Sequence, residues 1–148
     1  MARLKLRILT SDTIKVDEEV DMVIMRCVTE SVGNSSSVGE MGVLPGHIAC
    51  SAVLGISPIR IKQDEGWRII AVYGGLVRIK DDVVTVLTEK ADWPDEIDEA
   101  RARASMEEVE QRMREAMEED TEIRTNQIAL RRALVRVEVS SYPLIGRK

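Results

Sequence analysis

The side chains of this sequence that could carry out chemistry are few and scattered. His47 is the single histidine of the chain and lies in residues 42–48, GVLPGHI. A general base needs a substrate or a nucleophile beside it, and a metal site needs several good ligands together. One histidine cannot assemble such a cluster, so we interpret His47 as a turn residue that makes structural or interface hydrogen bonds. Cys27 and Cys50 have no CxxC spacing and lie in apolar stretches, which predicts reduced thiols in the core. We predict no catalytic residue and no metal site.

Two groups of charged residues remain as candidates for binding. The first is acidic and has no visible catalytic partner, so we interpret it as charge at the start of a helix; it comprises Asp92, Asp95, Glu96, Asp98 and Glu99. The second gives a predicted helix a basic face that is either a solvated surface or a docking surface for acidic groups or phosphate. It comprises Arg124, Arg131, Arg132 and Arg136.

The composition narrows the class of protein. The chain has 148 residues, of which 44% are hydrophobic and 32% charged, with a net charge of −5. This length allows a real core, and the acidic balance argues against nucleic acid as the main partner. The apolar runs are far shorter than the roughly 20 residues of a membrane helix, and the N-terminus is no signal peptide. We therefore expect a protein without a membrane span that stays in the compartment where it is made.

The elements that must position these residues fall into two regions. Eight of the nine glycines lie in residues 1–94, where short apolar runs alternate with turn signals at residues 64–66 and 80–82. Gly74 and Gly75 supply the backbone freedom for a sharp bend or a bulge. No helical pattern separates these runs before residue 92, so we predict an antiparallel β-sandwich or flattened barrel over residues 1–91.

Residues 92–148 are predicted to form two antiparallel helices joined by a short connection. Asp92 is the expected N-cap of the first helix, and Asp120 or Thr121 that of the second. Each helix carries a narrow apolar seam with spacings of 4, 3, 4 and 3, typical of helix-on-helix packing. Because these seams contain alanines and a glutamine, the docking of one helix on the other is expected to be marginal. The seams are Ala102, Met106, Val109, Met113 and Ala116 in the first helix, and Ile123, Gln127, Leu130, Leu134 and Val137 in the second.

Three motifs in register resemble one known family over essentially the whole chain. Residues 39–47, GEMGVLPGH, resemble the GExGxLPGH signature of the epsilon subunit of bacterial and chloroplast F-type ATP synthase. Residues 73–79 with 83–87 resemble its GGxxxV and VTVLA segments, and residues 97–102, IDEARA, resemble its (I/L)DxxRA motif. Two departures are residues 32–37, which look like a polar insertion, and residues 46–49, which lack a proline common in the family.

The resemblance implies an α+β fold: a sandwich of about ten strands over 1–91 and a helical hairpin over 92–148. It implies a non-catalytic subunit of the central stalk that joins the γ subunit to the c-ring, with Glu40 and His47 as interface candidates. In an extended state the hairpin would inhibit ATP hydrolysis by reaching the catalytic β and α subunits. The resemblance also implies a peripheral position on the cytoplasmic face of the bacterial plasma membrane, or on the stromal side of the thylakoid. Interface candidates in the hairpin are Arg124, Arg131, Arg132 and Arg136.

Some members of this family bind ATP against the compact hairpin. Glu108 stands where tightly binding members have a further arginine, so we expect ATP binding to be weak or absent, and no cofactor to be required. The alternatives to an inhibitory stalk subunit are an ATP-sensing hairpin module and a purely structural stalk adaptor. The residues that match the family's nucleotide site are Asp92, Asp98, Arg101, Ala102, Arg132 and Arg136.

Overall fold

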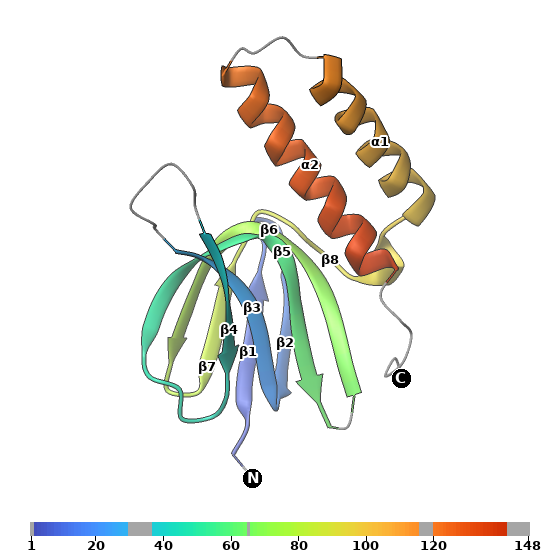
Figure 1. Ribbon diagram of the computed structural model, residues 1–148. Coiled ribbons are helices and arrows are strands. Elements are labelled where there is room, and N and C mark those ends of the chain that lie inside the picture. Colours follow the sequence, from blue (N-terminus) through green and yellow to red (C-terminus); the bar gives the residue numbers. More distant parts are fainter. Residues whose placement is uncertain (1, 30–36, 65, 116–119, 142–148) are drawn as a thin grey trace.

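The computed structural model describes residues 2–29, 37–64, 66–115 and 120–141. Eight strands precede a short 3-10 helix and two long helices (Figure 1). The predicted insertion at residues 32–37 lies almost wholly outside the described residues. The elements are β1 (Leu4–Leu9), β2 (Ile14–Val20), β3 (Met22–Thr29), β4 (Ser37–Val43), β5 (Cys50–Gln63), β6 (Gly66–Lys80), β7 (Val83–Leu87), β8 (Ala91–Asp92), η1 (Pro94–Glu96), α1 (Glu99–Glu115) and α2 (Asp120–Ser140).

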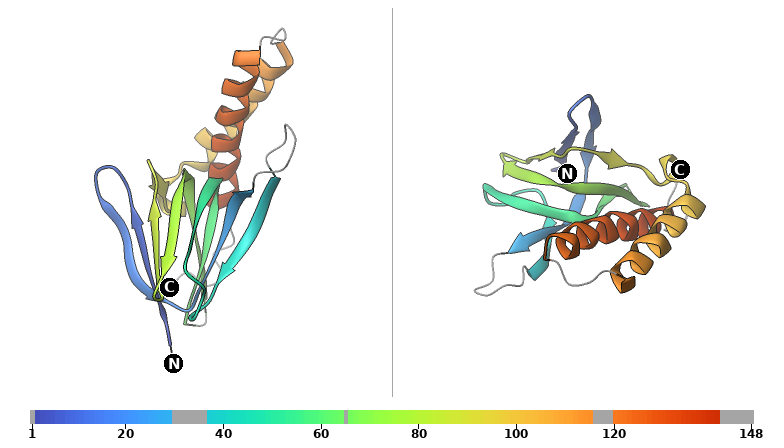
Figure 2. Two further views of the ribbon diagram at one scale, coloured as in Figure 1. Left: turned by 90° about the vertical axis from the view of Figure 1, so that its left-hand side faces the viewer. Right: turned by 90° about the horizontal axis from the view of Figure 1, so that it is seen from above.

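The strands form one sheet that folds over into two facing layers, with the helical hairpin at one end (Figures 1 and 2). The strand order is β2-β1-β7-β6-β5-β3-β4, and β8 pairs with β6. The pairing of β1 with β7 is parallel, and the other described pairs are antiparallel. The predicted β-sandwich followed by two helices is thus confirmed, with one parallel pair added to it.

The resemblance implied about ten strands, whereas the described residues form eight. The difference arises in β5 and β6, which are 14 and 15 residues long and pair along almost their whole length. Figure 1 shows both strands crossing over the end of the sandwich, so each serves both layers. Gly74 and Gly75 lie at this crossing with φ of 79° and 132°, as the predicted bend requires. A Cβ on Gly75 would lie 2.0 Å from the carbonyl oxygen of Leu87, so only glycine fits there.

The main core lies between the two layers of the sandwich. Leu4, Leu6 and Ile8 of β1 are fully buried, which confirms the alternating pattern of that strand. Cys27 and Cys50 are both free thiols, the first buried in the core and the second half-buried against it. Burial, and secondarily the nearby Cys50, raises the pKa of the Cys27 thiol, so Cys27 is protonated and unreactive at neutral pH.

The start of the hairpin differs from the prediction that Asp92 caps the first helix. Asp92 instead ends β8, and a 3-10 turn follows it at Pro94–Glu96. α1 begins only at Glu99, where the Asp98 carboxylate accepts a hydrogen bond of 3.1 Å from the backbone N–H of Arg101. Asp98 is therefore the N-cap, because it stands three residues before the donor that a capping side chain satisfies. The side chains of Asp120 and Thr121 lie outside the described residues.

The seam predicted for the second helix is wrong. In α2 the buried side chains are Ala133, Val135 and Val139, whereas Leu134 is 45% exposed. α1 packs on α2 through small residues, with Ala102 and Val109 buried on its side. Val135 and Val139 face the sheet and form a second apolar cluster with three β6 side chains and, at its edge, Ile56 and Ile97. The β6 members are Ile69, Ala71 and Tyr73.

Candidate functional site

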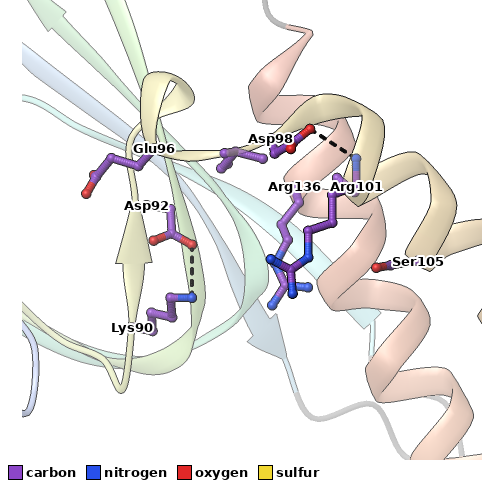
Figure 3. A pocket seen from close by; sticks show the side chains of 9 residues that line it. Lys90, Asp92, Glu96, Asp98, Arg101, Ser105 and Arg136 are labelled. Atoms are coloured by element: carbon purple, nitrogen blue, oxygen red, sulfur yellow. Dashed lines mark hydrogen bonds and ion pairs between the residues drawn. The ribbon is translucent and has the colours of Figure 1, made fainter.

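A polar pocket of about 390 Å³ lies where the end of the sandwich, the first turns of α1 and the last turns of α2 meet (Figure 3). β8 and the 3-10 turn bring acidic groups to one side of it. α1 and α2 each contribute an arginine to the other side. The lining residues are Lys90, Asp92, Glu96, Ile97, Asp98, Arg101, Ala102, Ser105 and Arg136.

Arg101 and Arg136 are directed toward the same side of this pocket from two different helices (Figure 3). In the part of the chain that the structure describes, the Arg101 guanidinium has no carboxylate within ion-pair distance. Arg136 likewise has no carboxylate partner there and instead donates a hydrogen bond of 3.2 Å from Nε to the Tyr73 hydroxyl. Two guanidinium groups without carboxylate partners favour an anion between them, since arginine binds phosphate and carboxylate oxygens through paired N–H donors.

The Tyr73 hydroxyl connects α2 to the sheet. It donates a hydrogen bond of 2.8 Å to Oδ2 of Asp92, and the Lys90 ammonium lies 3.6 Å from the same oxygen. The guanidinium of Arg136 and the ammonium of Lys90 also lie 5.2 and 5.8 Å from the centre of the Tyr73 ring. Burial, and then the hydrogen bond to Asp92, raises the pKa of Tyr73 to about 12, so the hydroxyl keeps its proton at neutral pH.

The 3-10 turn that forms one wall of the pocket is fixed to the sandwich. Lys15 Nζ lies 2.6 Å from one carboxylate oxygen of Glu96 and 2.7 Å from the other. Trp93 donates its backbone N–H back to the same carboxylate at 2.9 Å, and its ring lies under the Arg68 guanidinium at 4.3 Å. The hydrogen bond from Lys15 lowers the pKa of Glu96. The wall is therefore held by an ion pair, a backbone hydrogen bond and a cation–π contact.

The structure brings five of the six predicted nucleotide-site residues into this one pocket. The sixth, Arg132, lines an adjoining apolar groove of about 360 Å³ between the helices and lies 4.0 Å from Glu89. Glu108, which stands where tightly binding members of the family have a further arginine, pairs with Arg112 and lines neither cavity. Sequence reasoning missed Tyr73, whose contacts depend on tertiary packing alone. The residues gathered in the pocket are Asp92, Asp98, Arg101, Ala102 and Arg136.

The predicted partner residues lie apart from one another. Glu40 pairs with Arg60 at 3.1 Å and with Arg26 at 3.8 Å on the surface of the sandwich. His47 lies in the turn after β4, as predicted, where it is half-buried, and its Nδ1 lies 2.7 Å from the carbonyl oxygen of Ile48. In α2, Arg131 is exposed, whereas the side chain of Arg124 lies outside the described residues.

A row of exposed apolar side chains crosses three neighbouring strands of the sandwich. Val53 on β5 pairs with Leu76 on β6, and Leu76 pairs with Leu87 on β7. Each of the three is about half exposed. Single exposed apolar residues are common, but a contiguous cross-strand row is typical of a protein-protein contact. No single motif in the sequence indicated this row, because its members are joined only by strand register.

Two further observations concern membrane spans and metal ligands. Among the described residues, no helix is long and apolar enough to cross a membrane. The same part of the chain contains no group of three or more His, Cys, Asp or Glu side chains that could hold a metal ion. The expectation that the chain needs no cofactor stays a prediction.

Comparisons with known proteins agree with this architecture. The family model described as ATP synthase, Delta/Epsilon chain, beta-sandwich domain matches residues 3–94, and the long alpha-helix domain of the same family matches residues 95–141. The ATP synthase epsilon chain of Halalkalibacterium halodurans is 34% identical over 140 residues, covering 95% of this chain and 98% of its own. That of Bacillus licheniformis is 35% identical over 140 residues, with coverage of 95% and 99%. A chain of the Euglena gracilis mitochondrial ATP synthase structure has the same fold, with a TM-score of 0.75 at 23% identity, covering 93% of this chain and 81% of that one.

Proposed function

The chain belongs to the Delta/Epsilon chain family of ATP synthase, and from this premise we propose that it joins the γ subunit to the c-ring in the central stalk. In this role it is not catalytic; it transmits rotation and regulates hydrolysis. It would be peripheral to the membrane, on the cytoplasmic face of the bacterial plasma membrane. The curated relatives named above are bacterial, which favours that membrane over the thylakoid.

The sandwich offers two surfaces for the rotor. The apolar row of Val53, Leu76 and Leu87 supports docking on γ, since a helical partner with an apolar stripe could cover all three strands at once. Leu44 and Ile48 are exposed on either side of His47 in the turn after β4. We propose that this turn contacts the polar loops of the c-ring, with Glu40 on the neighbouring strand.

Regulation by the hairpin is supported mainly by how little apolar surface joins it to the sandwich. Val135 and Val139 of α2 carry that contact, and α1 packs on α2 rather than on the sheet. Such a small cluster permits an equilibrium between docked and undocked hairpins. In the undocked state the arginines of α2 could reach acidic segments of the catalytic β and α subunits and stop hydrolysis.

A second function, ATP binding at the hairpin, is supported by the pocket. Arg101 and Arg136 come from different helices and have no carboxylate partner among the described residues, so a triphosphate between them would hold both helices against the sandwich. Asp92 and Asp98 in the same pocket would reduce the attraction for an anion. We therefore propose weak binding that favours the docked state.

The test uses a cognate catalytic core depleted of this subunit. Its ATP hydrolysis is measured after adding back the full chain or residues 1–96, which retain β8 and the contact of Glu96 with Lys15. We expect both forms to bind γ and only the full chain to suppress turnover. If both bind and neither suppresses turnover, the hairpin is structural and the regulatory part of the proposal is wrong. If neither binds γ, the stalk role itself is wrong.

A further inference from the structure

Tyr73 does not line the pocket itself, but it contacts two of the elements that do, β8 and α2. It belongs to β6, is only 7% exposed and packs against Val135 and Val139 of α2. Its hydroxyl lies between Asp92 on β8 and Arg136 on α2, at 2.8 and 3.2 Å. A phenol in this position can act on a ligand only through the groups it holds.

The direction of the two hydrogen bonds follows from the chemistry of the partners. A guanidinium has no acceptor, so Arg136 donates from Nε to the hydroxyl oxygen, and the hydroxyl donates its own proton to the Asp92 carboxylate. The raised pKa of Tyr73 keeps that proton in place at neutral pH. The Tyr73 hydroxyl therefore has both a donor and an acceptor as partners. The hydrogen bonds run in one direction, from Arg136 to Tyr73 and from Tyr73 to Asp92.

The contact with Tyr73 occupies only the Nε–H of the Arg136 guanidinium and leaves its two terminal nitrogens available to a ligand. The Nε–H is occupied by Tyr73, and the ring of Tyr73 lies 5.2 Å from the guanidinium carbon. In the described residues no carboxylate occupies the two terminal nitrogens, and Arg136 lines the pocket together with Arg101. A free arginine side chain loses about 2 kcal/mol of rotamer entropy when it is fixed, so an arginine already held in place binds an anion at a lower entropic cost.

We propose that Tyr73 is a positioning residue that fixes Arg136 for an anionic phosphate group in the pocket. This role rests on the proposed ATP binding, because Tyr73 would strengthen that binding by holding Arg136 in place. Because Tyr73 also packs on α2, the same contact ties occupation of the pocket to docking of the hairpin. The ligand's phosphate would accept from the terminal nitrogens of Arg136 and would not contact Tyr73.

The first test is a double-mutant cycle on ATP affinity, measured by isothermal titration calorimetry on the full chain. Tyr73→Phe keeps the ring and its packing and removes only the hydroxyl, so we expect affinity to fall about tenfold, the effect of one lost hydrogen bond to a charged group. In an Arg136→Gln background the same change is expected to have no further effect, since Tyr73 acts through Arg136. Thr10→Val, which removes a hydroxyl in the distant β1–β2 turn, is the control and should leave affinity unchanged.

A second measurement examines the hydrogen bond between Arg136 and Tyr73 in the unsubstituted chain without any ligand. In the proposed arrangement the Nε–H of Arg136 exchanges slowly with solvent in NMR spectra, whereas that of the exposed Arg131 exchanges fast. Equal, fast exchange at both would overturn the positioning role whatever the behaviour of the variants.

The outcomes separate this role from the function on which it rests. No saturable binding of ATP at millimolar concentration by the unsubstituted chain would overturn the nucleotide site, and the role of Tyr73 with it. Saturable binding that Tyr73→Phe leaves unchanged would overturn the positioning role alone. A tenfold loss that persists in the Arg136→Gln background would also overturn it, because Tyr73 would then act independently of Arg136.

Discussion

Replacing Val139 with alanine tests how the hairpin is held on the sandwich. Val139 is fully buried and faces Ile69 and Ala71 of β6 across the second apolar cluster. The substitution removes two buried carbons, which at roughly 0.8 kcal/mol each corresponds to about 1.6 kcal/mol of docking free energy. Since 1.4 kcal/mol is tenfold, we expect the ratio of docked to undocked hairpins to fall about 15-fold.

The assay is energy transfer between dyes on cysteines introduced at Asp12 and Glu110, both exposed, in a background where Cys27 and Cys50 are replaced by alanine. Leu134→Ala is the matched control. It removes a larger apolar side chain from the same helix, but one that faces away from the sheet.

Val139→Ala should lower energy transfer, whereas Leu134→Ala should leave it unchanged. If Leu134→Ala lowers energy transfer as much, or Val139→Ala leaves it unchanged, the α2 face we assign to docking is wrong.

Three further predictions concern stability and charge. Gly75→Ala should destabilise the sandwich by more than about 3 kcal/mol in urea unfolding, because its φ is strained for alanine and the new Cβ meets a β7 carbonyl. Glu138→Gln removes the 3.2 Å ion pair with Arg26 and should make hairpin docking less sensitive to salt. The pKa of Glu96 is lowered by Lys15, so its contribution to stability is present above its ordinary pKa and lost as pH falls through the lowered value; Glu96→Gln should remove that acid-dependent part of urea stability.

The elements that the sequence predicts correctly are marked by residue types within a few positions of each other. The turn at residues 80–82 carries Asp81 and Asp82 with positive φ, and the turn at residues 64–66 carries Asp64 with positive φ. Aspartate tolerates this conformation, so the hairpins could be located from residue type alone. The bend at Gly74 and Gly75 was predictable for the same reason.

β2 escaped prediction because its sequence, IKVDEEV, buries only Val16 and Val20. It is an edge strand, and its exposed charged residues, Asp17 and Glu19, discourage pairing with another chain. A strand of this kind has almost no apolar alternation to detect. The parallel contact of β1 with β7 was equally invisible, since it joins segments about 80 positions apart through backbone hydrogen bonds alone.

In the pocket, too, residues of one short motif could be predicted, whereas residues joined only by tertiary packing could not. Asp98 and Arg101 lie in one short motif and could be singled out from sequence. Tyr73 could not, because its partners Asp92 and Arg136 lie 19 and 63 positions away. Asp92 reaches it through the pairing of β8 with β6, and Arg136 only after α2 has docked. The seam of α2 was misplaced because its heptad spacing is real but is not the surface that α1 covers.

α2 therefore has two apolar stripes, and only one of them is buried in the docked hairpin. Undocking exposes Val135 and Val139, each of which contributes about 1.5–3 kcal/mol by its burial. Together this is of the same order as the roughly 5.5 kcal/mol of differential binding needed to move an equilibrium from 1:99 to 99:1. Burial of the two valines therefore favours the docked side of the equilibrium in the isolated chain, and a predominantly undocked, inhibitory state requires a partner that covers these valines again. Leu134 on the opposite stripe is already exposed in the docked state, so such a partner could first contact α2 there.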